Sequence, residues 1–262
     1  MTKITLSGLH TYPIKSAAGI SLAHAKVTLR GLQHDRRWMV CDRSGKFLTQ
    51  RKLPKMALLQ VSVAADTLTL RSTHTALELP TPTTAQPMAV DVWGDRCPAW
   101  SMGDAAAQWL SDFLGTDAQL VYMPDSTHRP ADHGAFDTPN SFADAYPFLL
   151  ISEASLADLN GRLDQPVPMD RFRPNLVISG CAPFAEDTWK QIKIGDMVFD
   201  VAKACSRCSV PGVNQATGEQ GKEPLKTLAT YRRWDHAIWF GQNLLAHAAG
   251  TLQVGDEVEI LA

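Results

Sequence analysis

Apolar and polar residues alternate with a period of two along much of the first hundred residues. The alternation runs through residues 4–14 and 25–30, with breaks at Tyr12-Pro13 and Gly31, and the apolar run 38–41 predicts a third strand. Successive side chains of a β-strand point to opposite faces, so this period predicts strands with one face buried. We therefore expect the chain to begin with β structure.

Turn signals join several of these strands into predicted hairpins. The turns and their flanking runs are residues 42–46 between 38–41 and 47–48, Ala65-Asp66 between 58–63 and 67–70, and Gly94-Asp95 between 88–93 and 97–101. Short strands separated by such turns are typical of antiparallel sheets. Their spacing predicts a small antiparallel barrel or sandwich.

A helical period replaces the alternation at Asp104. Asp is a residue type that caps helix N-termini, and Gly115 is placed to end the helix in a left-handed conformation. The apolar residues between them share one helix face: Ala107, Trp109, Leu110, Phe113 and Leu114. We predict a helix over this segment.

The middle of the chain predicts a second helix among short strands. Ser152 is predicted to cap a helix that places Leu156, Leu159 and Leu163 at three- and four-residue spacing. Strands are predicted at residues 118–122, 148–151 and 176–178. Residues 124–142 are polar and without periodicity, which predicts a long loop.

Two segments near the C-terminus resemble each other. Residues 192–199 and 252–259 each place a Gly-Asp pair between two alternating runs. We interpret them as two equivalent β-turns of a barrel and not as a repeat array.

Composition and charge narrow the class of protein. The chain has 262 residues, of which 45% are hydrophobic and 20% charged, as is usual for a soluble globular protein. A net charge of −2 offers no bulk attraction to nucleic acid or acidic membranes, so neither is expected as a partner. The sequence shows no secretory signal and no bilayer-spanning apolar run. Five cysteines are an odd number in a long chain, which favours a reducing cytoplasm over a disulfide framework.

Two of the cysteines form the first candidate site. Cys205 and Cys208 lie three positions apart, with Arg207 between them and Lys203 upstream. Nearby cations favour the thiolate, which is both the nucleophile and the metal ligand. A structural zinc site needs four ligands, usually in two pairs, but this chain has only one C-x-x-C pair, so zinc is disfavoured. A thioredoxin-like redox pair needs a helix that begins at the first cysteine, and Pro211-Gly212 follow too soon for one. It stays open whether Cys205 only packs as a small hydrophobe while Cys208 reacts, or whether neither reacts.

Cations beside predicted turns form a second group of candidates. Lys15-Ser16 follow a strand end, Arg36-Arg37 follow Asp35, and Arg171 and Arg173 precede Pro174-Asn175. Guanidinium forks and ammonium groups suit phosphate and other anions, although each alone is more commonly a surface residue. No G-x-G-x-x-G or Walker loop is present, so dinucleotide or nucleoside-triphosphate binding is not indicated.

Short segments spread over the whole chain also match a known family in order. They are residues 12–16 (YPIKS), 35–38 (DRRW), 142–147 (FADAYP), 152–156 (SEASL), 171–175 (RFRPN), 204–208 (ACSRC), 217–218 (TG), 225–228 (LKTL) and 240–243 (FGQN). In these segments the chain resembles the MOSC-domain molybdenum proteins with an N-terminal MOSC β-barrel domain. That branch includes the mitochondrial amidoxime-reducing component and a bacterial reductase of N-hydroxylated bases.

The resemblance implies a mainly β fold of the α+β type. It implies an N-terminal β-barrel-like domain over residues 1–117 and a C-terminal MOSC β-barrel over residues 118–262, with a few peripheral helices. The cofactor would then lie in the cleft between the two domains.

The resemblance also implies a molybdenum–molybdopterin cofactor. Cys208 matches the thiolate that ligates molybdenum and would be the catalytic residue, with Arg207 favouring its deprotonated form and Cys205 as a structural neighbour. The positions that match cofactor-binding residues are Lys15, Ser16, Arg36, Asp144, Tyr146, Arg173, Asn175, Ser206 and Arg207, together with Ala145. Pyridoxal phosphate binding and detoxification are further associated with the family.

The implied reaction is a two-electron reduction of an N–O bond in hydroxylamines, amidoximes or N-hydroxylated bases. The bacterial relative carries a two-iron cluster in a C-terminal ferredoxin domain, and this sequence shows no matching cysteine spacing before Ala262. We therefore expect no iron–sulfur cluster in the chain and a separate electron-donor protein with a flavin or an iron–sulfur centre. No membrane anchor is evident, so a cytoplasmic protein is expected.

Two other functions fit the same residues. Cys208 could carry sulfur as a persulfide in molybdenum-cofactor maturation, or the protein could bind or store the cofactor without catalysis. The proton donor of a reductase is not evident from the sequence. Its candidates are Asp35, Asp144, Asp187 and His236.

Overall fold

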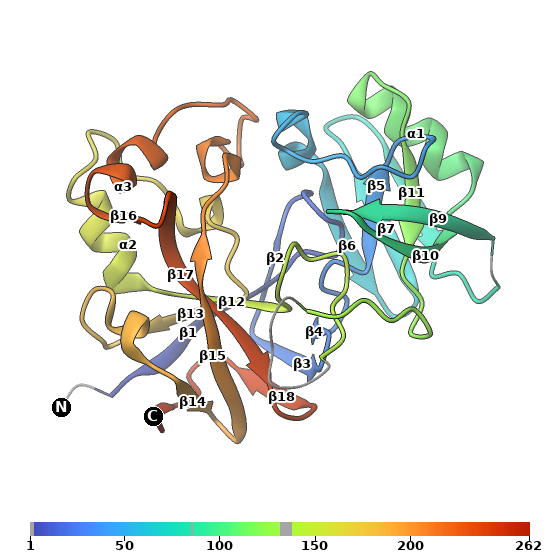
Figure 1. The fold of residues 1–262 in the computed structure, drawn as a ribbon. Helices are drawn as coiled ribbons and strands as arrows, with labels where there is room; N and C mark the ends of the chain where they lie inside the picture. The colour runs from blue at the N-terminus through green and yellow to red at the C-terminus, as the bar shows by residue number, and fades with distance from the viewer. Residues whose placement is uncertain (1–2, 85, 132–137) are drawn as a thin grey trace.

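Strands from both ends of the chain meet in one large sheet. The computed structural model describes residues 3–84, 86–131 and 138–262, which form two lobes (Figure 1). Over those residues the large sheet has nine strands. In sheet order they are β19 (Val258–Ile260), β14 (Gln191–Ile194), β15 (Met197–Ser206), β17 (Ala237–Ala246), β12 (Phe148–Ser152), β13 (Leu176–Ser179), β1 (Thr5–Thr11) and β2 (Ile20–Leu22), with β16 (Arg233–Trp234) paired to β17.

This sheet curls around an apolar core. Phe148 of β12 and Phe199 of β15 meet edge to face with ring centroids 5.4 Å apart, and both are buried. A small antiparallel sheet of β18 (Gly250–Gln253), β3 (His24–Thr28) and β4 (Gly31–Leu32) adds Val27 and Leu252 to the same core. Residues far apart in sequence therefore share one hydrophobic interior, which fixes the N-terminal strands to the C-terminal lobe.

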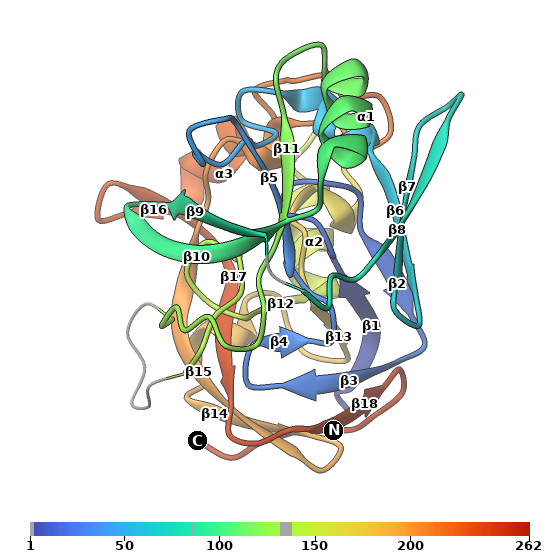
Figure 2. The same cartoon turned by 90° about the vertical axis from the view of Figure 1, so that its right-hand side faces the viewer.

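The second lobe contains two further sheets and a helix. One sheet has the order β5 (Trp38–Cys41), β11 (Gln119–Tyr122), β10 (Asp95–Ser101) and β9 (Pro87–Val92), and the other is β6 (Gln60–Ala64), β7 (Thr67–Arg71) and β8 (Ala76–Pro80). Helix α1 (Asp104–Leu114) lies beside β11, as Figure 2 shows from the side of this lobe. Strand β5 is buried along its whole length because Trp38 and Val40 face one core and Met39 and Cys41 face another.

Two shorter helices complete the regular structure. Helix α2 (Glu153–Asn160) follows β12, and helix α3 (Leu225–Tyr231) precedes β16. The 3₁₀ turns are η1 (Pro54–Leu58), η2 (Met169–Arg171), η3 (Ala185–Thr188) and η4 (Val210–Gly212). With nineteen strands and three α-helices in the described ranges, the predicted mainly β fold is confirmed.

Several predicted elements are found, with differences at their ends. Ser152 caps α2 by accepting from Ser155 N, and Gly115 ends α1 at φ 73°, both as predicted. The predicted cap of α1 is wrong, since Gly103 occupies the N-cap and Asp104 is the first helical residue. The second helix ends at Asn160, so Leu163 packs beyond it.

The turns also differ in register from the predictions. Val92 pairs with Asp95, so the β9–β10 turn consists of Trp93 and Gly94, one residue earlier than predicted. The Gly195-Asp196 turn joins a hairpin, β14–β15, as predicted. The Gly255-Asp256 turn does not, because β18 pairs with β3 while β19 pairs with β14.

The long loop predicted for residues 124–142 contains no named helix or strand in its described part, and residues 132–137 lie outside the described residues. Strands β2, β4, β8, β16 and β17 and helix α3 were not predicted. No described helix is long and apolar enough to cross a membrane.

Sheet pairing crosses the predicted domain boundary at residues 117 and 118 in both directions. Strand β1, from the predicted N-terminal domain, pairs with β13 of the C-terminal lobe. Strand β11, from the predicted C-terminal domain, pairs with β5 and β10 of the other lobe. The position of that boundary remains a prediction.

Candidate functional site

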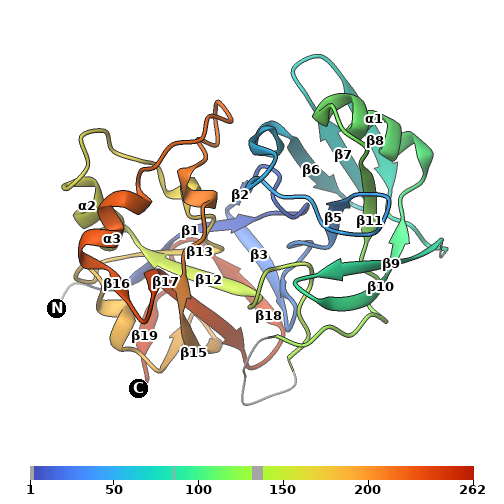
Figure 3. The ribbon, with the colours of Figure 1, turned by 45° about the horizontal axis from the view of Figure 1, so that its top comes forward.

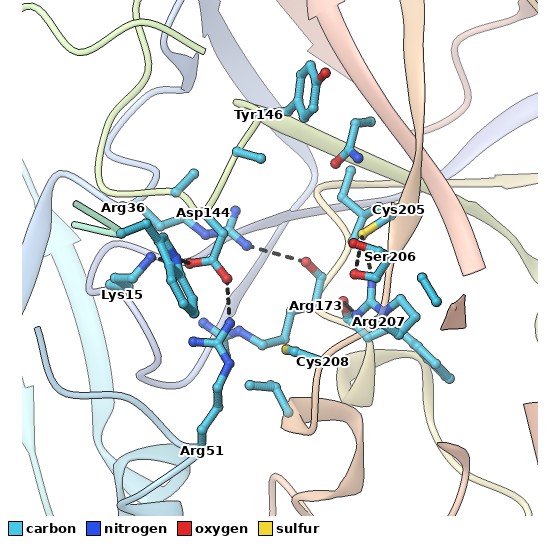
Figure 4. A pocket seen from close by; sticks show the side chains of 18 of the residues that line it. Lys15, Arg36, Arg51, Asp144, Tyr146, Arg173, Cys205, Ser206, Arg207 and Cys208 are labelled. Atoms are coloured by element: carbon cyan, nitrogen blue, oxygen red, sulfur yellow. Dashed lines mark hydrogen bonds and ion pairs between the residues drawn. The ribbon is translucent and has the colours of Figure 1, made fainter. Parts of the chain in front are cut away.

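A cavity of about 940 Å³ is lined by residues of both lobes. All ten residues predicted to form the site line it: Lys15, Ser16, Arg36, Asp144, Tyr146, Arg173, Asn175, Ser206, Arg207 and Cys208. Ser206 ends β15, and the others lie in the loops after β1 and β15 and before β5, β12 and β13. Figure 4 labels eight of the ten in the cavity wall. The fold thus brings five distant segments to one place, while the role of each residue stays a prediction.

An aspartate in the cavity wall accepts hydrogen bonds from three side chains. Asp144 accepts a hydrogen bond from Lys15 Nζ on one oxygen, together with Trp93 Nε1 at 3.0 Å, and from Arg51 Nη2 at 2.6 Å on the other. Burial alone would raise the pKa of Asp144, but the charges of Lys15 and Arg51 outweigh it and hold that pKa well below its usual range. Asp144 is therefore a fixed anion at neutral pH and a poor proton donor.

The lysine of this cluster is buried. Lys15 also donates to the carbonyl of Phe142 at 2.6 Å, and only 5% of the residue is exposed. Burial lowers the pKa of Lys15, and the neighbouring Asp144 opposes that shift. The ammonium is thus held in place by the anion beside it.

Arg129 fixes the segment that carries Asp144. Its guanidinium is buried and donates to the carbonyls of Ser141, Ala143 and Asp144 at 2.7 to 3.0 Å, and to Asp95 at 2.9 Å. Four donors of one rigid fork are used, so the backbone around Asp144 is tied to the other lobe through the β10 residue Asp95.

Two predicted arginines lie over the ring of Tyr12. The guanidinium carbons of Arg36 and Arg173 lie 4.5 and 4.2 Å from its centroid, and the Tyr12 hydroxyl donates to the carbonyl of Pro174 at 3.0 Å. Arg36 also donates to Asp35 at 2.5 Å and to Asn175 Oδ1 at 3.1 Å. The arginines are thereby oriented before any ligand arrives.

Asn175 is buried and hydrogen-bonded to Arg36. Its Nδ2 donates to the carbonyl of His10 and to Asp35, at 3.1 and 3.0 Å, and its Oδ1 accepts from Leu149 N at 3.3 Å as well as from Arg36. With these bonds made inside the protein and only 1% of the residue exposed, Asn175 is suited to position Arg36.

Several lining residues have a backbone that L-residues rarely adopt. Ser16, Arg36 and Arg173 have φ values of 67°, 47° and 56°. For a non-glycine residue, this left-handed backbone conformation is less favourable than a β or right-handed helical one. Such backbone strain is found mostly at functional sites. Here the turns aim the three side chains at the cavity.

The two thiols of residues 205–208 have different surroundings. Cys205 is partly buried against the cluster around Phe172, and Arg207 donates to its sulfur at 3.1 Å. Cys208 is exposed at the cavity wall. Arg207 was expected to favour the deprotonated form of Cys208, but it contacts the sulfur of Cys205. Cys208 interacts with Arg51, whose pKa burial would lower but which the charge of Asp144 raises.

Unused donors in the cavity wall indicate the kind of ligand it fits. Arg173 Nη2, Arg207 Nε and Arg51 Nε are buried and have no hydrogen-bond partner among the described residues. Burial lowers the pKa of Arg173 to about 10, so it stays charged at neutral pH. Of the described residues lining the cavity, seven are Lys or Arg and two are Asp. Buried donor atoms without a partner are costly, and an anionic group such as a phosphate would accept hydrogen bonds from them.

The lining residues that were not predicted include Arg51, Trp93 and Arg129. Each lies in a loop or turn without a motif, so no local signal marks it. Among the proton-donor candidates, Asp187 is bonded to Arg232 and Gln242, and Asp35 is buried against Arg36, whereas His236 lines the cavity.

Comparison with known proteins agrees with the family resemblance. The MOSC N-terminal beta barrel domain matches residues 3–117, and the MOSC domain matches residues 137–259. Mitochondrial amidoxime-reducing component 1 of Homo sapiens is 38% identical over 98% of this chain and 83% of its own length. Mitochondrial amidoxime reducing component 2 of Bos taurus is 37% identical over 97% of this chain and 82% of its own length.

A second kind of relative shares the same domains. Molybdenum cofactor sulfurase of Oryza sativa subsp. japonica is 35% identical over 92% of this chain but only 32% of its own length. The chain belongs to the MOSC-domain family, in the branch that contains the mitochondrial amidoxime-reducing components.

Proposed function

We propose that this protein is a molybdenum-cofactor-dependent oxidoreductase that reduces N-hydroxylated compounds. The observation that carries the proposal is the pairing, in one cavity, of unused buried guanidinium donors with an exposed thiol. A pterin phosphate requires such donors, and a sulfur-bound metal accepts a soft thiolate ligand. Relatives named for amidoxime reduction, more than a third identical over nearly the full chain, support the same activity.

The residues divide the work by their contacts. Arg173, Arg207 and Arg36 would hold the phosphate and pterin, with Lys15, Ser16, Ser206, Asp144 and Tyr146 completing the wall and Asn175 orienting Arg36. Cys208 would be the protein ligand of molybdenum. When bound, the cofactor supplies the two-electron redox chemistry, while the protein binds it and excludes competing ligands.

The reaction is R–NH–OH + 2e⁻ + 2H⁺ → R–NH₂ + H₂O. The N–O bond breaks, nitrogen is reduced by two electrons, and the oxygen leaves as water. The electrons would come from a separate donor protein with a flavin or an iron–sulfur centre. The proposed substrates of this protein are amidoximes, hydroxylamines and N-hydroxylated bases. Its proposed location is the cytoplasm.

The test combines metal analysis and turnover in one preparation. Purified protein is assayed for molybdenum and pterin, and for reduction of a hydroxylamine with reduced benzyl viologen as donor. Stoichiometric molybdenum with turnover supports the reductase. Molybdenum that is retained without reduction by any artificial donor would favour a binding or storage protein.

A sulfur-carrier function is the second candidate, and the match to the rice sulfurase favours it. In that case the exposed Cys208 would hold a persulfide. Mass spectrometry separates the two functions, since a carrier shows one additional sulfur on Cys208 in protein that retains no molybdenum.

A further inference from the structure

One tryptophan in the cavity wall is unusually exposed. Trp93 occupies the β9–β10 turn, lines the cavity, and leaves 55% of its surface accessible. Large aromatic side chains normally bury most of their area on folding, so an accessible indole at a cavity is a candidate contact for a ligand.

The indole is held in place although it is exposed. Its Nε1 donates to Asp144 at 3.0 Å, the guanidinium carbon of Arg51 lies 4.8 Å from its ring centroid, and the ring of Phe47 lies 5.1 Å away at a tilt of 55°. These contacts fix the orientation of the ring, while 55% of the residue stays accessible. A fixed, accessible ring loses little freedom when a second flat group stacks on it.

The backbone at Trp93 is also unfavourable for its side chain. Trp93 has φ 60° and Gly94 has φ 94°, and two-residue hairpin turns of this kind favour Asn-Gly or Asp-Gly. A bulky residue at positive φ is a genuine outlier, and such strain is found where a side chain has a function. A turn that only joined two strands would not need an indole there.

We infer that Trp93 is a specificity-determining residue that stacks on planar, conjugated substrates. The inference rests on the proposed function and adds selection of flat substrates, such as aromatic amidoximes, over aliphatic ones. Stacking on an aromatic ring depends on a flat π-face, which an aliphatic hydroxylamine lacks. Two residues of the β16–β17 hairpin on the other lobe, Arg233 and His236, also line the cavity. Figure 3 shows this hairpin and the β9–β10 hairpin on different lobes.

The test compares a planar and an aliphatic ligand of the same head group. Binding of benzamidine and of acetamidine to cofactor-loaded protein is measured by calorimetry, and the ratio of their affinities is compared between wild type and Trp93→Ala. We expect that ratio to fall about tenfold, because the stacking of the benzamidine ring on the indole is lost. Trp93→Phe, which keeps a flat face but removes the donor to Asp144, should retain most of the preference.

Trp234→Ala is the matched control. Trp234 is 41% exposed on the other hairpin but does not line the cavity in the described part of the chain, so its removal should leave the affinity ratio unchanged. An equal weakening of both ligands in Trp93→Ala, or the same change of ratio in Trp234→Ala, would overturn the inference.

A turnover arm separates this inference from the proposed function. The selectivity for benzamidoxime over acetamidoxime, as a ratio of kcat/KM values, should fall by a similar factor in Trp93→Ala. If wild type reduces neither compound, the proposed function fails, and the binding ratio alone decides whether Trp93 selects planar ligands.

Discussion

Arg207 donates from Nη1 to the sulfur of Cys205 at 3.1 Å, and from Nη2 to the carbonyl of Phe172 at 2.8 Å. This arginine therefore ties one thiol of the pair to the buried cluster around Phe172, while Cys208 remains exposed in the cavity. The two cysteines therefore differ in their surroundings. Cys208 is available to a ligand, and Cys205 is held by its neighbours.

Cys208→Ala should lose molybdenum, and Cys205→Ala should largely retain it. Loss of outer-shell partners already lowers metal affinity by about 10- to 100-fold, so loss of the ligand itself should lower the metal content by at least about tenfold. Molybdenum per protein and reductase activity are measured for both variants. Equal loss in the two would contradict the assignment of Cys208 as the ligand.

Arg173→Met should weaken retention of the pterin. Arg173 is 8% exposed, donates to the carbonyl of Ala17 at 2.6 Å, and keeps Nη2 without a partner in the described ranges. Hydrogen bonds to charged groups contribute about 1.5 to 3 kcal/mol, so affinity should fall by about 10- to 100-fold.

Pterin released by denaturation, measured by fluorescence, gives the retained fraction. Arg162→Met is the control, because Arg162 forms an exposed ion pair with Asp158 one helical turn away. Retention that falls equally in both variants would point to general destabilisation and not to a role of Arg173.

The variants Tyr12→Phe and Tyr12→Leu should distinguish the contribution of the Tyr12 hydroxyl from that of its aromatic ring. The Phe variant loses only the hydrogen bond to Pro174, so it should lower the free energy of unfolding by about 1 kcal/mol and keep the cofactor. The Leu variant removes the ring beneath Arg36 and Arg173, and each such contact contributes about 0.5 to 2 kcal/mol. Urea unfolding and pterin content are the measurements, and similar pterin loss in both variants would count against an orienting role of the ring.

Asp144 should make stability depend on pH in the acid range. Burial would raise its pKa, but Lys15 and Arg51 hold it below the ordinary value of 3.8. At a pH between the folded-state and the unfolded-state pKa of Asp144, the unfolded state binds more protons than the folded state. The stabilisation is therefore complete above the unfolded-state pKa and is lost as pH falls through the folded-state pKa.

Urea midpoints measured from pH 6 down to pH 3 test this dependence. Asp144→Asn should be less stable at neutral pH, because Lys15 stays buried without its anion, and its midpoint should change less with acid than that of wild type. Glu78→Gln removes an exposed carboxylate on β8 and should keep the wild-type slope. An unchanged slope in Asp144→Asn would contradict the prediction.

Local patterns predicted much of the fold where they were strong. The hairpin β6–β7, helix α1 with its end at Gly115, and the Ser152 cap of α2 all follow from periodicity and from residue types that act within one turn. The central strand β17 was missed although its residues are mostly apolar. Its two faces are both covered, so it lacks the alternation by which a half-buried strand is found.

The sequence by itself determined the β-rich character, the positions of the cation-bearing turns and, through the order of its family segments, the residues to examine. Only the tertiary structure decided which of them meet. Arg51, Trp93 and Asp144 come from distant loops, and Arg207 donates to the sulfur of Cys205. The physical reason is range: propensities and caps act over a few residues, whereas ion pairs, stacking and strand pairing depend on how distant segments are folded together.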